Sequence, residues 1–156
     1  MEAQTQPPVV LVVDDDDDIC DVLVRLLESE GCRVLAARFA EDAIALTTNE
    51  EPAVALLDIV LPRMDGLALA GEIRARWPDC RCIMITGQSS VDTAIEAIHQ
   101  GAVDYLSKQF FPLDNVWAAV QRALATREVE KNKRALLARR QEIKRELRAA
   151  VDDSKP

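Results

Sequence analysis

Five short, mostly apolar runs divide the first two thirds of the chain, and an amphipathic stretch follows each of them. The runs are Val9–Val13, Arg33–Ala36, Val54–Leu57, Cys82–Ile85 and Val103–Leu106. Several are continuously apolar, which is typical of strands buried on both faces. Strands that alternate with helices predict a parallel sheet covered by helices on both sides. We therefore expect an α/β fold with a doubly wound, five-stranded parallel sheet.

The amphipathic stretches predict the helices of this fold. They lie at 17–29, 40–49, 67–76 and 91–100, and a fifth begins at 113. Several end at a stop signal such as Gly31, Pro78 or Gly101. The fifth helix has no such signal, because residues 126–151 lack Gly and Pro and are rich in Lys, Arg, Glu, Leu and Ala. It should continue as one long helix.

The length of 156 residues suits one domain with an appendage. We expect a domain at 1–126, a helical extension at 127–151 and a disordered tail at 152–156. Apolar residues recur every seven positions from Val129 to Ala150, but their companion positions are polar, so the seam of a coiled coil is incomplete. A dimer-forming coil and a solvated linker helix both remain open.

Charge and composition limit the partners of the chain. Residues 1–126 carry 21 acidic and 9 basic residues, a net of −12, whereas residues 127–150 carry 9 basic and 4 acidic residues, a net of +5. The body repels nucleic acid, and the extension holds no helix-turn-helix or zinc motif, so specific DNA binding by this chain alone is not expected.

Membrane contact is not expected either, because no stretch approaches the roughly 18 apolar residues of a membrane span and the first residues lack the features of a signal peptide. We expect a cytoplasmic protein. The four cysteines fit neither a disulfide framework nor a paired zinc motif, so we interpret them as buried apolar fillers.

Polar residues follow four of the five predicted strands. Asp14 and Asp15 come after the first, Asp58 after the third, Thr86 after the fourth and Lys108 after the fifth. In a doubly wound sheet, ligands bind beyond the carboxyl ends of the strands. The sequence therefore predicts one site at this rim that combines carboxylates, a hydroxyl and an ammonium.

Carboxylates held close together repel one another, and a hard divalent cation with oxygen ligands relieves that repulsion. Mg²⁺ is the expected ion. A carboxylate beside Mg²⁺ can attack a phosphoryl group while the cation and a fixed ammonium neutralise the phosphoryl oxygens. Asp58 and Lys108 supply these two roles. Asp16, Asp17 and Asp18 are interpreted as a solvated helix start, where carboxylates favour the helix dipole.

Four segments resemble the receiver domain of bacterial response regulators. They are VVDDDDDI, LLDIVLPRMDGL, MITGQSSVDTAI and GAVDYLSK, and the resemblance covers about residues 8–126. It implies a flavodoxin-like sheet with strand order 2-1-3-4-5. It also implies that Asp58 takes a phosphoryl group from the phosphohistidine of a sensor histidine kinase or phosphotransfer protein, as part of a two-component system.

The resemblance assigns further roles around the acceptor. Asp14 and Asp15 would hold Mg²⁺ together with Asp58 and the backbone carbonyl of Val60. Thr86 looks like the hydroxyl that moves to the phosphoryl group, Tyr105 like the aromatic ring that turns inward in response, and Lys108 like the cation that pairs with the phosphoryl group. The conformational switch would then control a partner, an attached output or a homodimer.

One position departs from the family pattern, because Gln109 stands where receivers usually have proline. A cis peptide bond before a non-proline residue costs about 2.5 to 4 kcal/mol, so we expect a trans bond and a different loop path after Lys108. A phosphorylation-independent receiver that acts as an interaction module is therefore the alternative function. A dehalogenase-type phosphatase with Asp14 as nucleophile fits less well, because it leaves LPRMDG unexplained.

Overall fold

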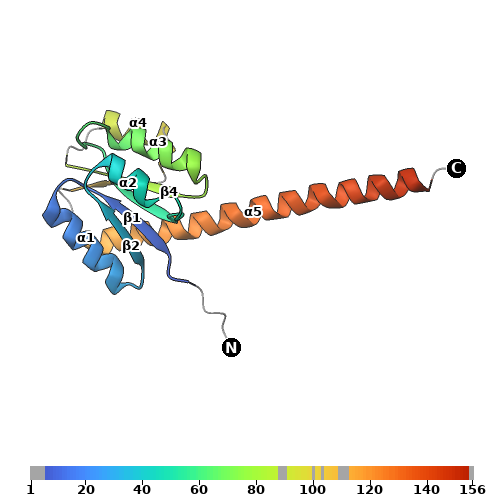
Figure 1. Cartoon of the computed structure of the whole chain (residues 1–156), viewed down its shortest axis with the longest axis horizontal. Coiled ribbons are helices and arrows are strands. Elements are labelled where there is room, and N and C mark those ends of the chain that lie inside the picture. Colours follow the sequence, from blue (N-terminus) through green and yellow to red (C-terminus); the bar gives the residue numbers. More distant parts are fainter. Residues whose placement is uncertain (1–5, 88–90, 100, 103, 109–112, 155–156) are drawn as a thin grey trace.

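The five predicted strands form one parallel sheet. The computed structural model describes residues 6–87, 91–99, 101–102, 104–108 and 113–154 (Figure 1). Its strands are β1 (Val9–Val13), β2 (Arg33–Ala37), β3 (Val54–Asp58), β4 (Arg81–Thr86) and β5 (Asp104–Ser107). Their order is β2-β1-β3-β4-β5, and each neighbouring pair is parallel. The predicted fold class and strand order are confirmed.

Helices cover both faces of this sheet. They are α1 (Asp17–Ser29), α2 (Ala40–Leu46), α3 (Gly66–Arg76), α4 (Val91–His99) and α5 (Leu113–Asp153). One apolar layer joins the sheet to α2, α3 and α4, and the other joins it to α1 and α5. Within β1, Leu11 and Val13 enter the first layer while Val10 and Val12 enter the second. This alternation explains why the strand is apolar throughout.

The four cysteines are free and buried, as expected from the sequence. They occupy both apolar layers: Cys80 and Cys82 lie in the layer under α2, α3 and α4, and Cys20 and Cys32 lie in the layer under α1 and α5. Because each fills core volume, their role is packing.

Several element boundaries differ from the predicted ones. Helix α2 ends at Leu46 and not at Asn49, because the hydroxyls of Thr47 and Thr48 donate to carbonyls of the preceding turn at 2.8 and 3.0 Å. Such back-bonding competes with continuation of the helix. Strand β5 lies one residue further along than predicted, and its predicted first residue, Val103, falls outside the described residues.

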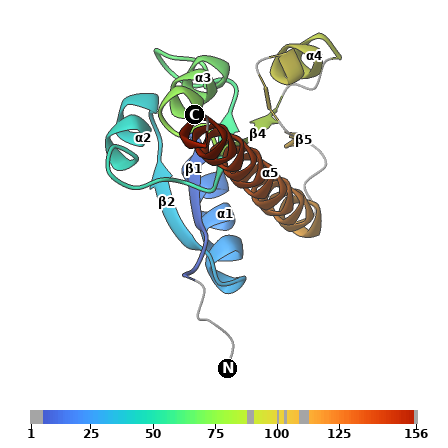
Figure 2. The same ribbon diagram turned by 90° about the vertical axis from the view of Figure 1, so that its right-hand side faces the viewer.

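Helix α5 is a single element of 41 residues, which corresponds to about 60 Å at 1.5 Å per residue. Figure 1 shows it leaving the α/β body and projecting far beyond it, and Figure 2 shows the same helix from the side of its C-terminal end. The predicted long helix is confirmed. It also includes Asp152 and Asp153, which the sequence had placed in a disordered tail. Among the described residues, none of the helices has the length and apolar character needed to cross a membrane.

Candidate functional site

The carboxyl ends of the strands bring the acidic residues together. Asp14 follows β1 and Asp58 ends β3, and their side chains are only 1% and 4% exposed. Asp15 is exposed beside them. One carboxylate oxygen from each of these three residues lies within 4.8 Å of the other two. The structure therefore assembles the three carboxylates that the sequence predicted at this rim.

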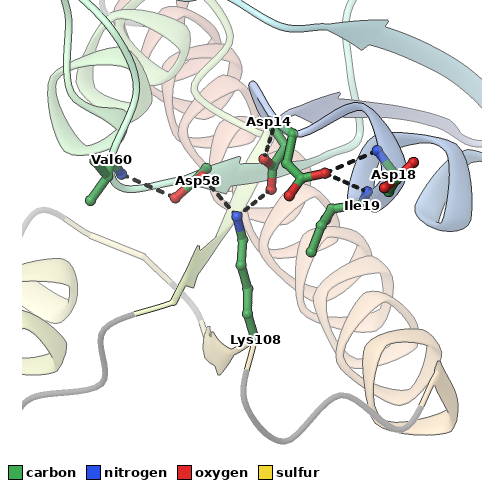
Figure 3. A network of polar contacts seen from close by, with 7 residues as sticks. Asp14, Asp18, Ile19, Asp58, Val60 and Lys108 are labelled. Atoms are coloured by element: carbon green, nitrogen blue, oxygen red, sulfur yellow. Dashed lines mark hydrogen bonds and ion pairs between the residues drawn. The ribbon is translucent and has the colours of Figure 1, made fainter.

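Lys108 lies between the two buried carboxylates. Its Nζ atom is 2.8 Å from Oδ2 of Asp14 and 2.9 Å from Oδ2 of Asp58, and only 18% of its side chain is exposed. Figure 3 shows the ammonium reaching both acids from the β5 side. Nζ donates a hydrogen bond to Asp58, whereas Asp14 Oδ2 is a buried oxygen without a hydrogen-bond partner. The contact with Asp14 is thus an ion pair without hydrogen-bond alignment.

Burial and charge act in opposite directions on these groups. Burial is the largest influence on Asp14 and, with repulsion from Asp58, raises the pKa of its carboxyl, although Lys108 and the Asp16 N–H act to lower it. Burial also acts to lower the pKa of Lys108, but the two carboxylates outweigh it, so the pKa of this ammonium is raised. The lysine therefore remains a cation at neutral pH.

Backbone N–H groups fix the orientation of both buried acids. The Val60 N–H donates to Asp58 Oδ1 at 3.0 Å, and the Asp16 N–H donates to Asp14 Oδ1 at 2.9 Å. Each carboxylate is consequently held at one oxygen by the chain and at the other by Lys108. Charged acceptors make strong hydrogen bonds, so this arrangement limits rotation of the side chains.

Asp16 caps the helix that follows the site. Its carboxylate accepts hydrogen bonds from the N–H groups of Asp18 and Ile19 at 3.0 and 3.3 Å (Figure 3). Asp17 and Asp18 stand in the first turn of α1. The interpretation of this acidic run as a helix start is confirmed. The cap fixes the position at which the chain turns from β1 into α1, directly after Asp14 and Asp15.

A pocket of about 270 Å³ opens at the Asp58 carboxylate. It is lined by Asp15, Asp58, Val60, Gly87 and Lys108. The Val60 side chain is 62% exposed, so it borders the pocket without filling the core. The pocket gives an incoming group access to Asp58 although this side chain is almost entirely buried.

Gly66 packs against the end of β3 at Asp58, and the sequence reasoning did not identify it. A Cβ atom at this position would lie 1.9 Å from the carbonyl oxygen of Asp58. The Gly66 N–H also donates to the carbonyl of Ile59 at 2.8 Å. The close approach of the α3 start to the end of β3 therefore requires glycine. Its position in the LPRMDG segment was the available signal.

Thr86 and Tyr105 occupy the neighbouring strands. Thr86 ends β4, is 1% exposed, and its carbonyl accepts a hydrogen bond from the Lys108 N–H at 2.8 Å. Tyr105 lies on β5 opposite Met84 and is partly buried against the apolar layer under α2, α3 and α4. Backbone hydrogen bonding between β4 and β5 thus links the strands of Thr86 and Tyr105 to the position of Lys108. Gln109 lies outside the described residues.

The geometry and charge of the rim fit a divalent cation. Three carboxylates supply hard oxygen ligands that lie within 4.8 Å of one another, and the single Lys108 ammonium beside the two buried ones balances only part of their charge. Fold and site together define a doubly wound α/β domain with an acidic, lysine-containing centre at the carboxyl edge of a parallel sheet. A pocket leads to one of its acids.

The chain belongs to the response regulator receiver domain family, whose model matches residues 10–121, more than half of its length. It is therefore a regulatory receiver domain of the two-component phosphorelay type. The nitrogen assimilation regulatory protein NtrX of Azorhizobium caulinodans is 34% identical over 153 residues, covering 92% of this chain and 34% of the relative. The DNA-binding transcriptional regulator NtrC of Escherichia coli K12 is 38% identical over 104 residues, covering 67% and 22%. The chain thus spans about a third or less of these relatives.

Solved structures show the same relationship. The receiver domain of NtrX from Brucella abortus has a TM-score of 0.71 and 39% sequence identity, covering 75% of this chain and 98% of that one. A CheY-like receiver domain protein from Methanospirillum hungatei has a TM-score of 0.74 and 31% identity, covering 80% and 98%. The matched parts are receivers, and α5 continues beyond the family match.

Proposed function

We propose that Asp58 is the phosphoacceptor of this receiver and that a sensor histidine kinase or phosphotransfer protein is the donor. The observation that carries the proposal is the placement of the Asp58 carboxylate, which is buried, oriented by Val60 and Lys108, and reached through a pocket. Asp14 contacts the same lysine but does not line that pocket. Of the two buried acids, Asp58 is therefore the one that a donor can approach.

In the proposed transfer, an oxygen of Asp58 donates an electron pair to the phosphorus of a phosphohistidine. The P–N bond breaks, and its electron pair returns to the imidazole of the donor. Lys108 already contacts Oδ2 of Asp58, so it is placed to neutralise charge on the transferred group. The Val60 N–H holds the second carboxylate oxygen during the approach.

We further propose Mg²⁺ as the ion held by Asp14, Asp15 and Asp58, with the Val60 carbonyl as an additional ligand. Bound there, it would offset the charge of the carboxylates and of the phosphoryl oxygens. The cluster of three carboxylates, two of which share a single ammonium, supports this assignment. The chain's own slow dephosphorylation is part of the same proposal.

The switch and its output complete the proposal. Thr86 moves toward the phosphoryl group and Tyr105 turns inward, which changes the surface formed by β5 and α5. The protein acts in the cytoplasm, either on a partner or on an attached output domain, and the helical extension beyond residue 126 links the receiver to that output or pairs two copies. Long relatives such as NtrX are compatible with a linker.

Beryllofluoride, a phosphoryl mimic, provides the experiment. ¹⁹F NMR of the full chain with Mg²⁺ and beryllofluoride should show a protein-bound signal that disappears in Asp58→Asn and in samples without Mg²⁺. Asp18→Asn, which alters an exposed acid on α1, is the matched control and should retain the signal. A bound signal that persists in Asp58→Asn would contradict the assignment of the acceptor.

A further inference from the structure

The first turns of the helical extension contact the body of the receiver at a second place. Arg127 Nη2 lies 2.7 Å from Oε1 of Glu51, and Arg134 forms an ion pair with Asp79. Glu51 precedes β3 and Asp79 precedes β4. Both contacts therefore lie at the amino-terminal rim of the sheet, opposite the rim that carries Asp58. Strands β3 and β4 run from these two contacts to the opposite rim, where β3 ends at Asp58 and β4 ends at Thr86.

The two ion pairs differ in burial and therefore in their expected contribution to stability. The Arg127 side chain is 12% exposed and that of Glu51 34%, whereas Arg134 is 53% exposed. Exposed ion pairs contribute little, while breaking a buried one is costly because it leaves an uncompensated charge. Arg127 Nε is also buried without a hydrogen-bond partner, so the guanidinium is enclosed by the body. Arg127 should contribute most to stability, whereas Arg134, two turns further along α5, should restrict the direction of the helix.

The electrostatic surroundings of Asp79 agree with this docking. Arg134 is the main cause that holds the pKa of the Asp79 carboxyl below its usual range, and Arg127 and Lys131 act in the same direction. Three basic residues of the extension therefore face the acidic rim. From residue 132 onward every described residue of α5 is exposed, and the Arg134–Asp79 ion pair is the one between the extension and the body that lies furthest along α5 among the described residues.

The docking also fixes which side of the helix faces outward. Arg127 and Arg134 are two turns apart and share one face of α5. Val129 and Leu136 repeat the same spacing two residues later, about 200° around the helix axis at 3.6 residues per turn. These apolar side chains are 62% and 72% exposed. The face that contacts the receiver and the side that carries Val129 and Leu136 are thus opposite each other.

We propose that Arg127 with Glu51 and Arg134 with Asp79 form an intramolecular clamp that sets the direction and rotation of the α5 extension relative to the receiver. The clamp directs the apolar positions away from the receiver's own surface. It also moves the functional boundary of the receiver from residue 126 to a point after Arg134. A chain cut at Thr126 would lose both arginines and leave Glu51 and Asp79 without these partners.

Pulsed electron paramagnetic resonance on the full chain tests the clamp. Nitroxide labels at Glu72→Cys on α3 and Ala149→Cys near the end of α5 report the direction of the helix, and both positions are exposed. The four native cysteines are buried, and a sample without added cysteines measures their labelling. Dilution with unlabelled protein removes distances between copies. The clamped chain should give one narrow distance distribution.

The expected result is that Arg127→Gln with Arg134→Gln loses this narrow distribution, while Arg145→Gln retains it. Arg145 is the matched control, because it lies five helical turns beyond Arg127 on the same face and has no ion pair among the described residues. Exchanging the charges with Glu51→Arg and Arg127→Glu should restore the narrow distribution.

An unchanged distribution in the folded double variant would overturn the proposal, as would equal broadening in Arg145→Gln. If the loss of Arg127 prevents folding, the more exposed ion pair between Arg134 and Asp79 is tested instead. Asp79→Asn and Arg134→Gln should then each broaden the distribution, and a narrow distribution in both would overturn the clamp. None of these measurements depends on phosphorylation of Asp58.

Discussion

Replacing Lys108 with Met removes the only cation that the structure places against the two buried acids within its described residues. The variant keeps most of the apolar stem and loses two ion pairs of 2.8 and 2.9 Å. At an effective dielectric constant of about 20, each pair has a Coulomb energy of about 6 kcal/mol, much of it offset by desolvation. Loss of one partner of a buried pair costs about 3 to 5 kcal/mol. Since Lys108 is 18% exposed, we expect about 3 kcal/mol.

The pH dependence identifies the cause of this loss. Without the ammonium, the already raised pKa of Asp14 should rise further. An acid whose pKa is raised in the folded state destabilises the fold at pH values above that raised pKa. This destabilisation decreases as the pH falls from the raised pKa to the unfolded-state pKa. The deficit of the variant should therefore be present at pH 7 and shrink toward the ordinary carboxyl value of 3.8. The raised pKa of Lys108 adds stability below 10.5 that the wild type loses at higher pH.

Urea unfolding at several pH values without divalent cations measures both effects. Lys144→Met, at an exposed position that has no ion pair with another described residue, should change the free energy of unfolding by less than about 0.5 kcal/mol. Equal stability of Lys108→Met and the wild type at pH 7 would refute the reasoning. A deficit that stays constant from pH 7 to pH 4 would show that packing and not charge is responsible.

Three further changes test the support around the site. Gly66→Ala should lower the free energy of unfolding by about 1 to 3 kcal/mol, because its Cβ would overlap the Asp58 carbonyl. Gly71→Ala, in open space on the same helix, is the control and should stabilise the chain by up to about 1 kcal/mol. Equal shifts of the melting temperature in the two variants would contradict this explanation. Asp16→Ala should cost about 1 kcal/mol by uncapping α1, and an unchanged unfolding midpoint would exclude that role. Val60→Asn should shorten the lifetime of a phosphorylated Asp58 by offering water a polar partner at the pocket; identical decay rates would remove any such role.

The sequence predicted the sheet well because its strands are buried on both faces. Val10, Leu11 and Val12 are fully buried, so a continuous apolar run was the correct signal. The sheet topology was enough to predict that the rim residues lie together. Asp14 and Asp58 stand at the carboxyl ends of neighbouring parallel strands, and this placement does not depend on how the helices pack. The end of α2 was missed because Thr47 and Thr48 end that helix through hydroxyl contacts with the preceding turn.

Contacts between distant parts of the chain lay beyond sequence reasoning. Arg127 and Glu51 are 76 residues apart, and Arg134 and Asp79 are 55 apart. Nothing in the local pattern distinguishes these arginines from the exposed ones that follow on the same helix. The heptad pattern suggested an interface on α5, but only the folded structure shows which face the receiver itself occupies.

The clamp also affects how the extension should be studied. A truncation intended to separate the receiver from the helix should end after Arg134, so that both ion pairs with the body are kept. Light scattering of such a truncation against the full chain, with and without a phosphodonor, would then report pairing through the outer part of α5. Cutting at Thr126 would combine that effect with loss of the clamp.

The most direct test of the central claim is to incubate the purified chain with Mg²⁺ and acetyl phosphate and to map the product by mass spectrometry. We expect an adduct of about 80 Da, the mass of one phosphoryl group, on the peptide that contains Asp58. The adduct should be absent from Asp58→Ala and from samples without Mg²⁺. An adduct on another residue, or no adduct even with a competent histidine kinase, would contradict the central claim.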